Sequence, residues 1–162
     1  MKLLLIRHAI AVPRGTPGIE DDERPLTPRG RRRFRRAARG LARIVAAPDL
    51  ILASPLPRAW ATAEMAARAW RSCAPTRTPA LAHGTVDEVL AVLRTHARRR
   101  LVAVVGHEPM LSALLARLLG AADAERLAFR KGGAALVDAS APESGGRLVW
   151  FLKPRLLRTL SE

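Results

Sequence analysis

The sequence predicts an α/β fold, a three-layer sandwich in which a mainly parallel central sheet carries helices on both faces. Two observations point to it. Short apolar runs typical of buried strands, such as Leu3–Ile6 and Leu101–Gly106, alternate along the chain with segments of helical periodicity. No repeat or low-complexity linker divides the 162 residues, so we expect a single domain over residues 1–162. Strands that alternate with helices form parallel sheets covered on both faces.

The first elements can be placed from their end signals. The first strand ends at Arg7, and a loop rich in Pro, Gly and acidic residues leads to Thr27-Pro28, which has the N-cap and first-turn chemistry of a helix start. We expect this helix to extend to about Ala46. A second strand follows over 49–54, and Ser54-Pro55 reads as the opening of a second helix. The later elements are expected as a strand over 76–81, a helix over 86–93, a strand over 101–106, a Leu-rich helix ending near Gly120, and closing strands over 134–138 and 148–152 with a turn around Ser144-Gly145-Gly146.

The charge balance raises the question of nucleic-acid binding. The net charge is +14, and eight arginines lie within residues 29–43. These arginines are interleaved with apolar residues at the spacing of one buried helix face, namely Phe34, Ala37, Ala38, Leu41, Ile44 and Val45. We therefore interpret the arginines as the solvated face of a helix, and the absence of an aromatic stacking platform disfavours nucleic acid as the main partner. Any role of the Arg-rich helix at 29–43 stays open.

Cysteine content and hydropathy bear on location. The single Cys73 excludes an intrachain disulfide and fits a reducing compartment, where we expect it as buried filler rather than as a nucleophile. The N-terminal apolar run is broken at Arg7, which makes it too short for a signal-peptide core. No stretch has the uncharged length needed to cross a bilayer, so we expect a cytoplasmic protein without a membrane partner.

Four residues with related chemistry come at equivalent places in this pattern. Arg7 and His8 end the first strand, Arg58 lies in the first turn of the second helix, and His107 ends the strand over 101–106. Carboxyl ends of parallel strands share one sheet edge, where such folds bind ligands. Guanidinium groups hold phosphate oxygens, and a neutral imidazole attacks phosphorus. Each residue alone would pass as a capping or surface residue, but their joint placement predicts a phosphate pocket.

The same segments resemble the ordered motifs of the histidine phosphatase superfamily, and in particular its SixA-type phosphohistidine phosphatases. The resemblance covers nearly the whole chain and implies a phosphoglycerate mutase-like fold. The usual Arg-His-Gly of the superfamily is Arg-His-Ala here, which we expect to be tolerated unless Ala9 needs a positive φ. The motifs that carry the resemblance are Arg7-His8-Ala9, Arg24-Pro25-Leu26-Thr27, Ser54-Pro55-Leu56-Pro57-Arg58-Ala59 with Thr62-Ala63, and Gly106-His107-Glu108-Pro109.

The resemblance implies a role for each matching residue. His8 would be the nucleophile that forms a phosphohistidine intermediate, neutral at the attacking nitrogen and held in one tautomer by an acceptor at the other. Arg7 and Arg58 would clamp phosphate oxygens, His107 would donate to an equatorial oxygen, and Arg24 would add a positive contact. No metal or other cofactor is expected.

The general acid is left open between His83, Asp87, Glu88 and none of them. Asp87 and Glu88 also read as ordinary carboxylates in the first turn of a helix. Glu108 is expected to cap the helix that follows it, and the acidic group over 20–23 to form a solvated turn or to approach the pocket. A phosphoramidate releases an imidazole, which makes a dedicated carboxylic acid less necessary than for an alkyl phosphate.

These features lead to one function and two alternatives. We expect a metal-independent phosphatase that removes phosphate from phosphohistidine in a protein, with the chain favoured as a monomer. One alternative is a phosphomonoesterase acting on a nucleotide or sugar phosphate, and the other is a non-catalytic basic domain that binds anionic partners. An open pocket without a lid insertion favours a phosphate carried by a protein, because small substrates are usually enclosed.

Overall fold

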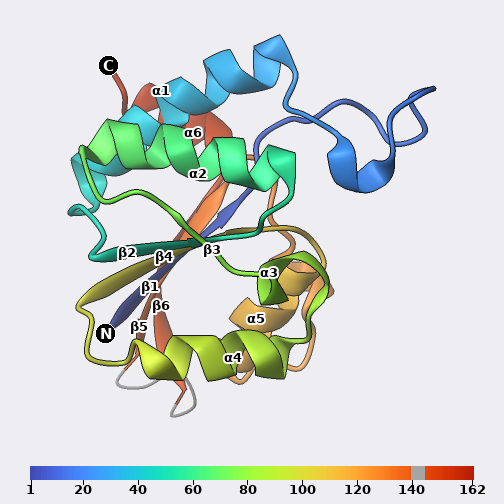
Figure 1. Ribbon diagram of the computed structural model, residues 1–162. Helices are drawn as coiled ribbons and strands as arrows, with labels where there is room; N and C mark the ends of the chain where they lie inside the picture. Colours follow the sequence, from blue (N-terminus) through green and yellow to red (C-terminus); the bar gives the residue numbers. More distant parts are fainter. Residues whose placement is uncertain (140–144) are drawn as a thin grey trace.

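A six-stranded sheet forms the centre of the computed structural model, which describes residues 1–139 and 145–162 (Figure 1). The strands lie in the order β3-β2-β4-β1-β5-β6. β1 pairs in parallel with β4, β4 with β2, and β2 with β3, whereas β5 is antiparallel to both of its neighbours. The strands are β1 (Lys2–Arg7), β2 (Leu50–Ala53), β3 (Thr76–Arg77), β4 (Leu101–Gly106), β5 (Ala134–Ala139) and β6 (Gly146–Leu152).

Helices cover both faces of this sheet. Figure 1 shows α1, α2 and α6 on one face and α3, α4 and α5 on the other. This is the predicted three-layer α/β architecture, and the fold-class prediction is confirmed. The helices are α1 (Pro28–Ile44), α2 (Pro57–Trp70), α3 (Ala80–His83), α4 (Val86–Thr95), α5 (Met110–Leu119) and α6 (Pro154–Thr159), with short 3-10 turns η1 (Asp21–Glu23) and η2 (Glu125–Leu127).

Alternation along the central strands divides the apolar side chains between two cores. In β1, Leu4 and Ile6 pack with α1 and α2, whereas Leu3 and Leu5 pack with α4 and α5. Successive strand residues point to opposite faces, so a strand that is apolar throughout requires cover on both sides. The continuous apolar runs in the sequence follow from this arrangement.

The Arg-rich segment forms α1 as predicted. The Thr27 side chain accepts a hydrogen bond from the Gly30 amide (2.9 Å), and Pro28 occupies the first turn. Phe34 and Leu41 are buried, and the arginines of the helix are exposed or half-buried. The expectation for Ile44 was wrong, because the helix ends there and leaves the side chain 38% exposed.

The structure corrects several element boundaries. The strand predicted over 76–81 stops at Arg77, and the chain turns at Thr78-Pro79 into α3. The second helix begins at Pro57 rather than at Ser54-Pro55, because Pro57 takes the first helical position. Helix α6 was not predicted, although Lys153-Pro154 carries the same start signal.

Two further expectations concern the surface and one turn. Cys73 is exposed, not buried, since it follows the end of α2. The turn predicted around residues 144–146 begins at Ser144, which lies outside the described residues. Within the described part of the chain, every helix is too short or too polar to cross a bilayer.

Candidate active site

Three parallel strands deliver the predicted residues to one edge of the sheet. Arg7 at the end of β1 is in register with Gly106 at the end of β4, and Ala53 at the end of β2 is in register with Val105. Beyond the ladder, the His8 amide donates to the Gly106 carbonyl (3.0 Å). The side chains of His8, His107, Arg7 and Arg58 all line one cavity of about 670 Å³ at this edge. The sequence predicted this convergence from the ends of two strands and the start of one helix.

His8 is held in a single tautomer. Its Nδ1 lies 2.7 Å from the Ala9 carbonyl oxygen, which only accepts, so Nδ1 carries the proton and Nε2 has a free lone pair. Burial, together with the charges of Arg58 and Arg7, lowers the pKa of His8 to about 3 despite the hydrogen bond to Ala9. The ring is therefore neutral at physiological pH. An acceptor behind the ring and a neutral imidazole are what a nucleophilic His8 requires.

The backbone beside His8 is tied to helix α2. The Ala9 amide donates to Thr62 Oγ1 (3.0 Å), and the Thr62 hydroxyl donates to the Arg58 carbonyl (2.7 Å). Arg71 is the one non-glycine residue with positive φ in the described chain, so Ala9 replaces the usual glycine without backbone strain. Thr62 thus couples the position of the His8 ring to the helix turn that carries Arg58.

Arg7 and Arg58 have nitrogens without partners. Arg7 Nη1 donates to the Phe129 carbonyl, and Arg58 Nη1 donates to the Asp21 carbonyl (2.8 Å). The Nε of each is buried and makes no hydrogen bond in the described structure. Burial lowers the pKa of both guanidinium groups, although each remains a cation. Buried N–H donors without partners are costly, and an oxyanion would satisfy them.

His107 lies beside His8 in the wall of the same cavity. Its Nε2 lies 2.8 Å from Ser54 Oγ, and the Leu56 amide donates to that same oxygen (3.3 Å). A hydroxyl oxygen both donates and accepts, so this contact fits either neutral tautomer of His107. Nδ1 is buried without a partner, and the two histidine rings lie 5.1 Å apart between centroids. Burial and the proximity of His8 lower the pKa of His107 to about 3.

The connection between β1 and α1 supplies a charged wall that sequence analysis only partly anticipated. Arg24 is buried, donates from Nε to Asp21 (2.9 Å) and from Nη1 to the Val12 carbonyl (2.7 Å), and lines the cavity. Asp21 also pairs with Arg14 (3.1 Å) and lies 3.9 Å from Arg58. Desolvation opposes ionisation of Asp21, but Arg24 and the neighbouring arginines lower its pKa. The acidic group therefore reaches the cavity instead of forming only a solvated turn.

Lys131 is a cavity residue that sequence analysis missed. The Gly132 amide, at φ +78°, donates to the carbonyls of Arg7 and His8 (3.1 and 3.0 Å). This contact brings the turn against the end of β1 and places Lys131 in the cavity wall. A lysine beside a Gly-Gly pair was the available signal.

The three candidates for a general acid separate clearly. His83 lines the cavity, with Nε2 2.7 Å from an Asp22 carboxylate oxygen. Asp87 pairs with Arg117 (3.4 Å), and Glu88 forms a capping box with Thr85 at the start of α4. Neither of these carboxylates lines the cavity.

Glu108, although it lies next to His107, is committed to structure. One carboxylate oxygen accepts from the Ser112 amide (3.3 Å) and hydroxyl in the first turn of α5, and the other accepts from the Phe129 amide (2.6 Å). The prediction that it caps α5 is confirmed. Residues 1–139 and 145–162 contain no group of three His, Cys, Asp or Glu side chains arranged to hold a metal ion.

The mostly parallel sheet with two histidines and two arginines at its carboxyl edge defines an α/β protein of the phosphoglycerate mutase-like class. Within this class, the chain belongs to the histidine phosphatase superfamily (branch 1), whose family model matches residues 3–85. That match contains Arg7, His8, Arg24 and Arg58, and supports the assignment as a phosphatase.

Solved structures similar to this chain include two described as SixA. The putative phosphohistidine phosphatase SixA from Agrobacterium tumefaciens is 26% identical with a TM-score of 0.82, covering 94% of this chain and 97% of its own. The protein histidine phosphatase SixA complexed with tungstate is 27% identical with a TM-score of 0.83, covering 97% and 99%. A putative α-ribazole-5′-phosphate phosphatase from Escherichia coli, 22% identical with a TM-score of 0.76 and covering 95% and 97%, shares the fold. A comparison with curated protein sequences gave no match.

Proposed function

We propose that the chain is a phosphohistidine phosphatase in which His8 accepts the phosphoryl group. The observation that carries the proposal is the His8 hydrogen bond to the Ala9 carbonyl, which leaves a neutral Nε2 in a cavity with unpartnered nitrogens of Arg7, Arg58 and His107. We assign the ring proton of His107 to Nδ1, where it would donate to a phosphate oxygen. A nucleophile surrounded by buried donors fits a phosphoryl group better than any uncharged substrate.

The reaction divides into two displacements at phosphorus. In the first, the lone pair of His8 Nε2 forms an N–P bond while the bond from phosphorus to the leaving group breaks. In the second, a water molecule attacks the phosphohistidine, the N–P bond breaks, and inorganic phosphate leaves with Nε2 recovering its lone pair. Arg7, Arg58 and the His107 Nδ1–H stabilise the charge on the equatorial oxygens in both steps.

The leaving group decides how much acid catalysis is needed. A phosphohistidine substrate releases an imidazole nitrogen, which takes up one proton as it leaves. We assign delivery of that proton to His83, which hydrogen-bonds to Asp22 and is the one of the three sequence candidates that lines the cavity. Three carboxylates line the cavity, but Asp21 is ion-paired with arginines, Asp22 contacts His83, and Glu108 accepts from the Phe129 amide. Each of these carboxylates is already engaged, which supports a phosphoramidate substrate over an alkyl phosphate.

Protein-borne phosphohistidine is supported by the SixA neighbours, one of which holds tungstate, a tetrahedral oxyanion like phosphate. A cavity of about 670 Å³ is also large enough for a small phosphate ester, so a small-molecule phosphomonoesterase is the second candidate. The complete set of Arg7, His8, Arg58 and His107 argues against a non-catalytic domain. A cytoplasmic location and a monomeric state belong to the same proposal.

A substrate comparison tests this function. Wild type, His8→Ala and a His96→Ala control, whose ring does not line the cavity, are incubated with a protein phosphorylated on histidine and with a panel of alkyl phosphates. We expect wild type and His96→Ala to prefer the phosphohistidine protein by about tenfold or more in kcat/KM, and His8→Ala to be inactive. Preference for an alkyl phosphate would favour the second candidate, and activity of His8→Ala equal to wild type would refute both.

A trapping experiment tests the intermediate directly. Rapid quenching with ³²P-labelled substrate should leave label on His8 that is stable in base and lost in acid, as expected of an N–P bond. Label on any other residue would contradict the assigned nucleophile.

A further inference from the structure

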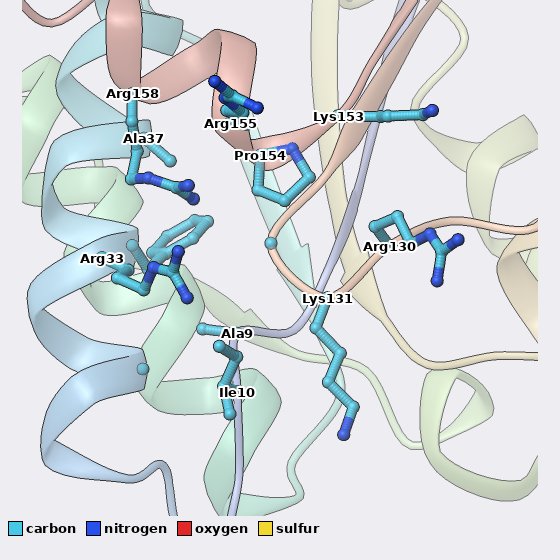
Figure 2. A pocket seen from close by; sticks show the side chains of 13 residues that line it. Ala9, Ile10, Arg33, Ala37, Arg130, Lys131, Lys153, Pro154, Arg155 and Arg158 are labelled. Carbon is cyan, nitrogen blue, oxygen red and sulfur yellow. The ribbon is translucent and has the colours of Figure 1, made fainter.

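A second hollow lies beside the catalytic cavity and is surrounded by cations. This hollow, of about 260 Å³, lies between α1, α6 and the loop that precedes β5 (Figure 2). Six of its lining side chains are basic, and we call them the cationic groove: Arg33, Arg130, Lys131, Lys153, Arg155 and Arg158. Figure 2 shows Arg33 and Arg158 extending from α1 and α6 toward the loop that carries Arg130 and Lys131, with Pro154 between them.

The groove concentrates charge that the described structure does not neutralise. None of its six basic side chains forms an ion pair with a described residue, and no acidic residue lines it. Arg158 is half-buried, and desolvation together with Arg33, Arg36 and Arg155 lowers its pKa. Like charges gathered without counter-charge destabilise the fold, and an anionic ligand would offset that repulsion.

Two residues connect the groove to the catalytic cavity. Lys131 lines both hollows, and Ala9, whose carbonyl accepts the hydrogen bond from His8 Nδ1, lines the groove. Because the two hollows share Lys131, a macromolecule that places a phosphoryl group in the cavity can extend into the groove beside it.

We propose that the cationic groove is a docking surface for an acidic segment of the protein that carries the phosphohistidine. This inference rests on the proposed function and specifies its partner: carboxylate side chains beside the phosphorylated histidine would engage the groove while the phosphoryl group enters the cavity. Arginine guanidiniums pair well with carboxylates, and complementary charge accelerates association. The groove offers no aromatic platform for bases, because its one aromatic residue, Phe34, is 1% exposed, so an acidic protein fits it better than single-stranded nucleic acid.

Matched variants and matched substrates test the docking surface. The groove variant combines Arg33→Gln, Arg155→Gln and Arg158→Gln and leaves Lys131 in place. The control variant combines Arg68→Gln, Arg98→Gln and Arg99→Gln, which lie outside the groove and remove the same charge. The substrates are a phosphohistidine peptide flanked by aspartates, the same peptide with asparagines, and free phosphohistidine.

We expect wild type to prefer the aspartate peptide over the asparagine peptide by about tenfold in kcat/KM at low salt, and 0.3 M NaCl to reduce that preference. The groove variant should lose the preference and turn over free phosphohistidine like wild type, while the control variant keeps it. Equal kcat/KM for both peptides in wild type, or equal losses in the two variants, would overturn the docking surface. If duplex DNA inhibits hydrolysis of the aspartate peptide at a lower concentration than polyaspartate does, the groove would be assigned to nucleic acid instead.

These outcomes are separable from failure of the enzyme itself. If wild type hydrolyses no phosphohistidine substrate, the proposed function is wrong, and the inference of an acidic partner is wrong as well. If free phosphohistidine is hydrolysed without any preference between the peptides, the function stands and only the docking surface is refuted.

Discussion

Two buried histidines within one cavity create a conflict between burial and protonation. His8 and His107 are 5% and 8% exposed, and burial lowers the pKa of each to about 3. Neutral rings suit both proposed roles, since His8 needs a free lone pair and a neutral His107 still has one ring N–H to donate. A bound phosphate would offset the positive field of Arg7 and Arg58 and make protonation easier.

This conflict predicts how stability depends on pH. An unfolded histidine has a pKa near 6.5, so below that pH the unfolded chain takes up protons that folded His8 and His107 refuse. The free energy of unfolding should fall as pH drops from 6.5 toward 3, with each histidine contributing a loss of about 2 kcal/mol by pH 5. Asp21 and Asp49, whose pKa values are lowered, lose their contribution only near and below pH 3.8, so they do not affect a comparison between pH 7 and pH 5.

Urea denaturation at pH 7 and pH 5 measures the effect. His8→Gln, which cannot take up a proton, should lose about 2 kcal/mol less than wild type between the two pH values. Equal losses in the two proteins would show that His8 is not held neutral by the fold.

The sequence could predict which residues meet at the site but not their hydrogen bonds. Arg7, His8, Arg58 and His107 each follow or open a recognisable element, so the parallel sheet alone brings them together. The Ala9 carbonyl behind His8 and the Ser54 hydroxyl behind His107 act through backbone direction and rotamers. Sequence patterns specify neither backbone direction nor side-chain rotamers. Lys131 was missed because its place in the cavity wall also depends on how the backbone of its turn packs against β1.

At the scale of elements, local sequence signals predicted where a helix lies better than they predicted which other elements pack against it. Periodicity predicted α1 and its buried face, but the packing of α6 on α1 depends on a close approach that periodicity does not encode. Gly40 permits that approach, since a Cβ there would lie 1.8 Å from the Leu157 carbonyl oxygen. The short length of β3 likewise depends on Thr78-Pro79, where the chain turns into α3.

Gly40→Ala tests the contact between α1 and α6. Alanine has higher helix propensity by about 1 kcal/mol, yet the new methyl group collides with backbone, and we expect a net loss of about 2 kcal/mol in the free energy of unfolding. Arg39→Ala, at an exposed neighbour, should change it by less than about 0.5 kcal/mol. Chemical denaturation of both variants measures this, and a Gly40→Ala protein as stable as Arg39→Ala would contradict the packing argument.

At the scale of the whole molecule, the net charge of +14 is distributed unevenly. The catalytic cavity balances its arginines with Asp21 and Asp22, whereas the cationic groove has no described counter-charge. Composition gave the total charge, but only the fold separates the paired arginines from the unpaired ones. Repulsion should therefore be strongest at the groove and weaker elsewhere on the surface.

Salt titration of stability tests this distribution. Raising NaCl from 20 to 300 mM shortens the Debye length from about 20 Å to about 6 Å, which screens repulsion between exposed cations. We expect the thermal midpoint of wild type to rise by a few degrees. Both variants lose three charges, but Arg98 and Arg99 of the control line a hollow that also contains Asp49 and Asp138, whereas no acidic residue lines the groove. The rise should therefore be smaller in the groove variant than in the control variant. A midpoint that falls with salt, or equal rises in the two variants, would show that the groove arginines do not repel one another strongly. Relief of that repulsion would then contribute nothing to the affinity of the groove for an acidic partner.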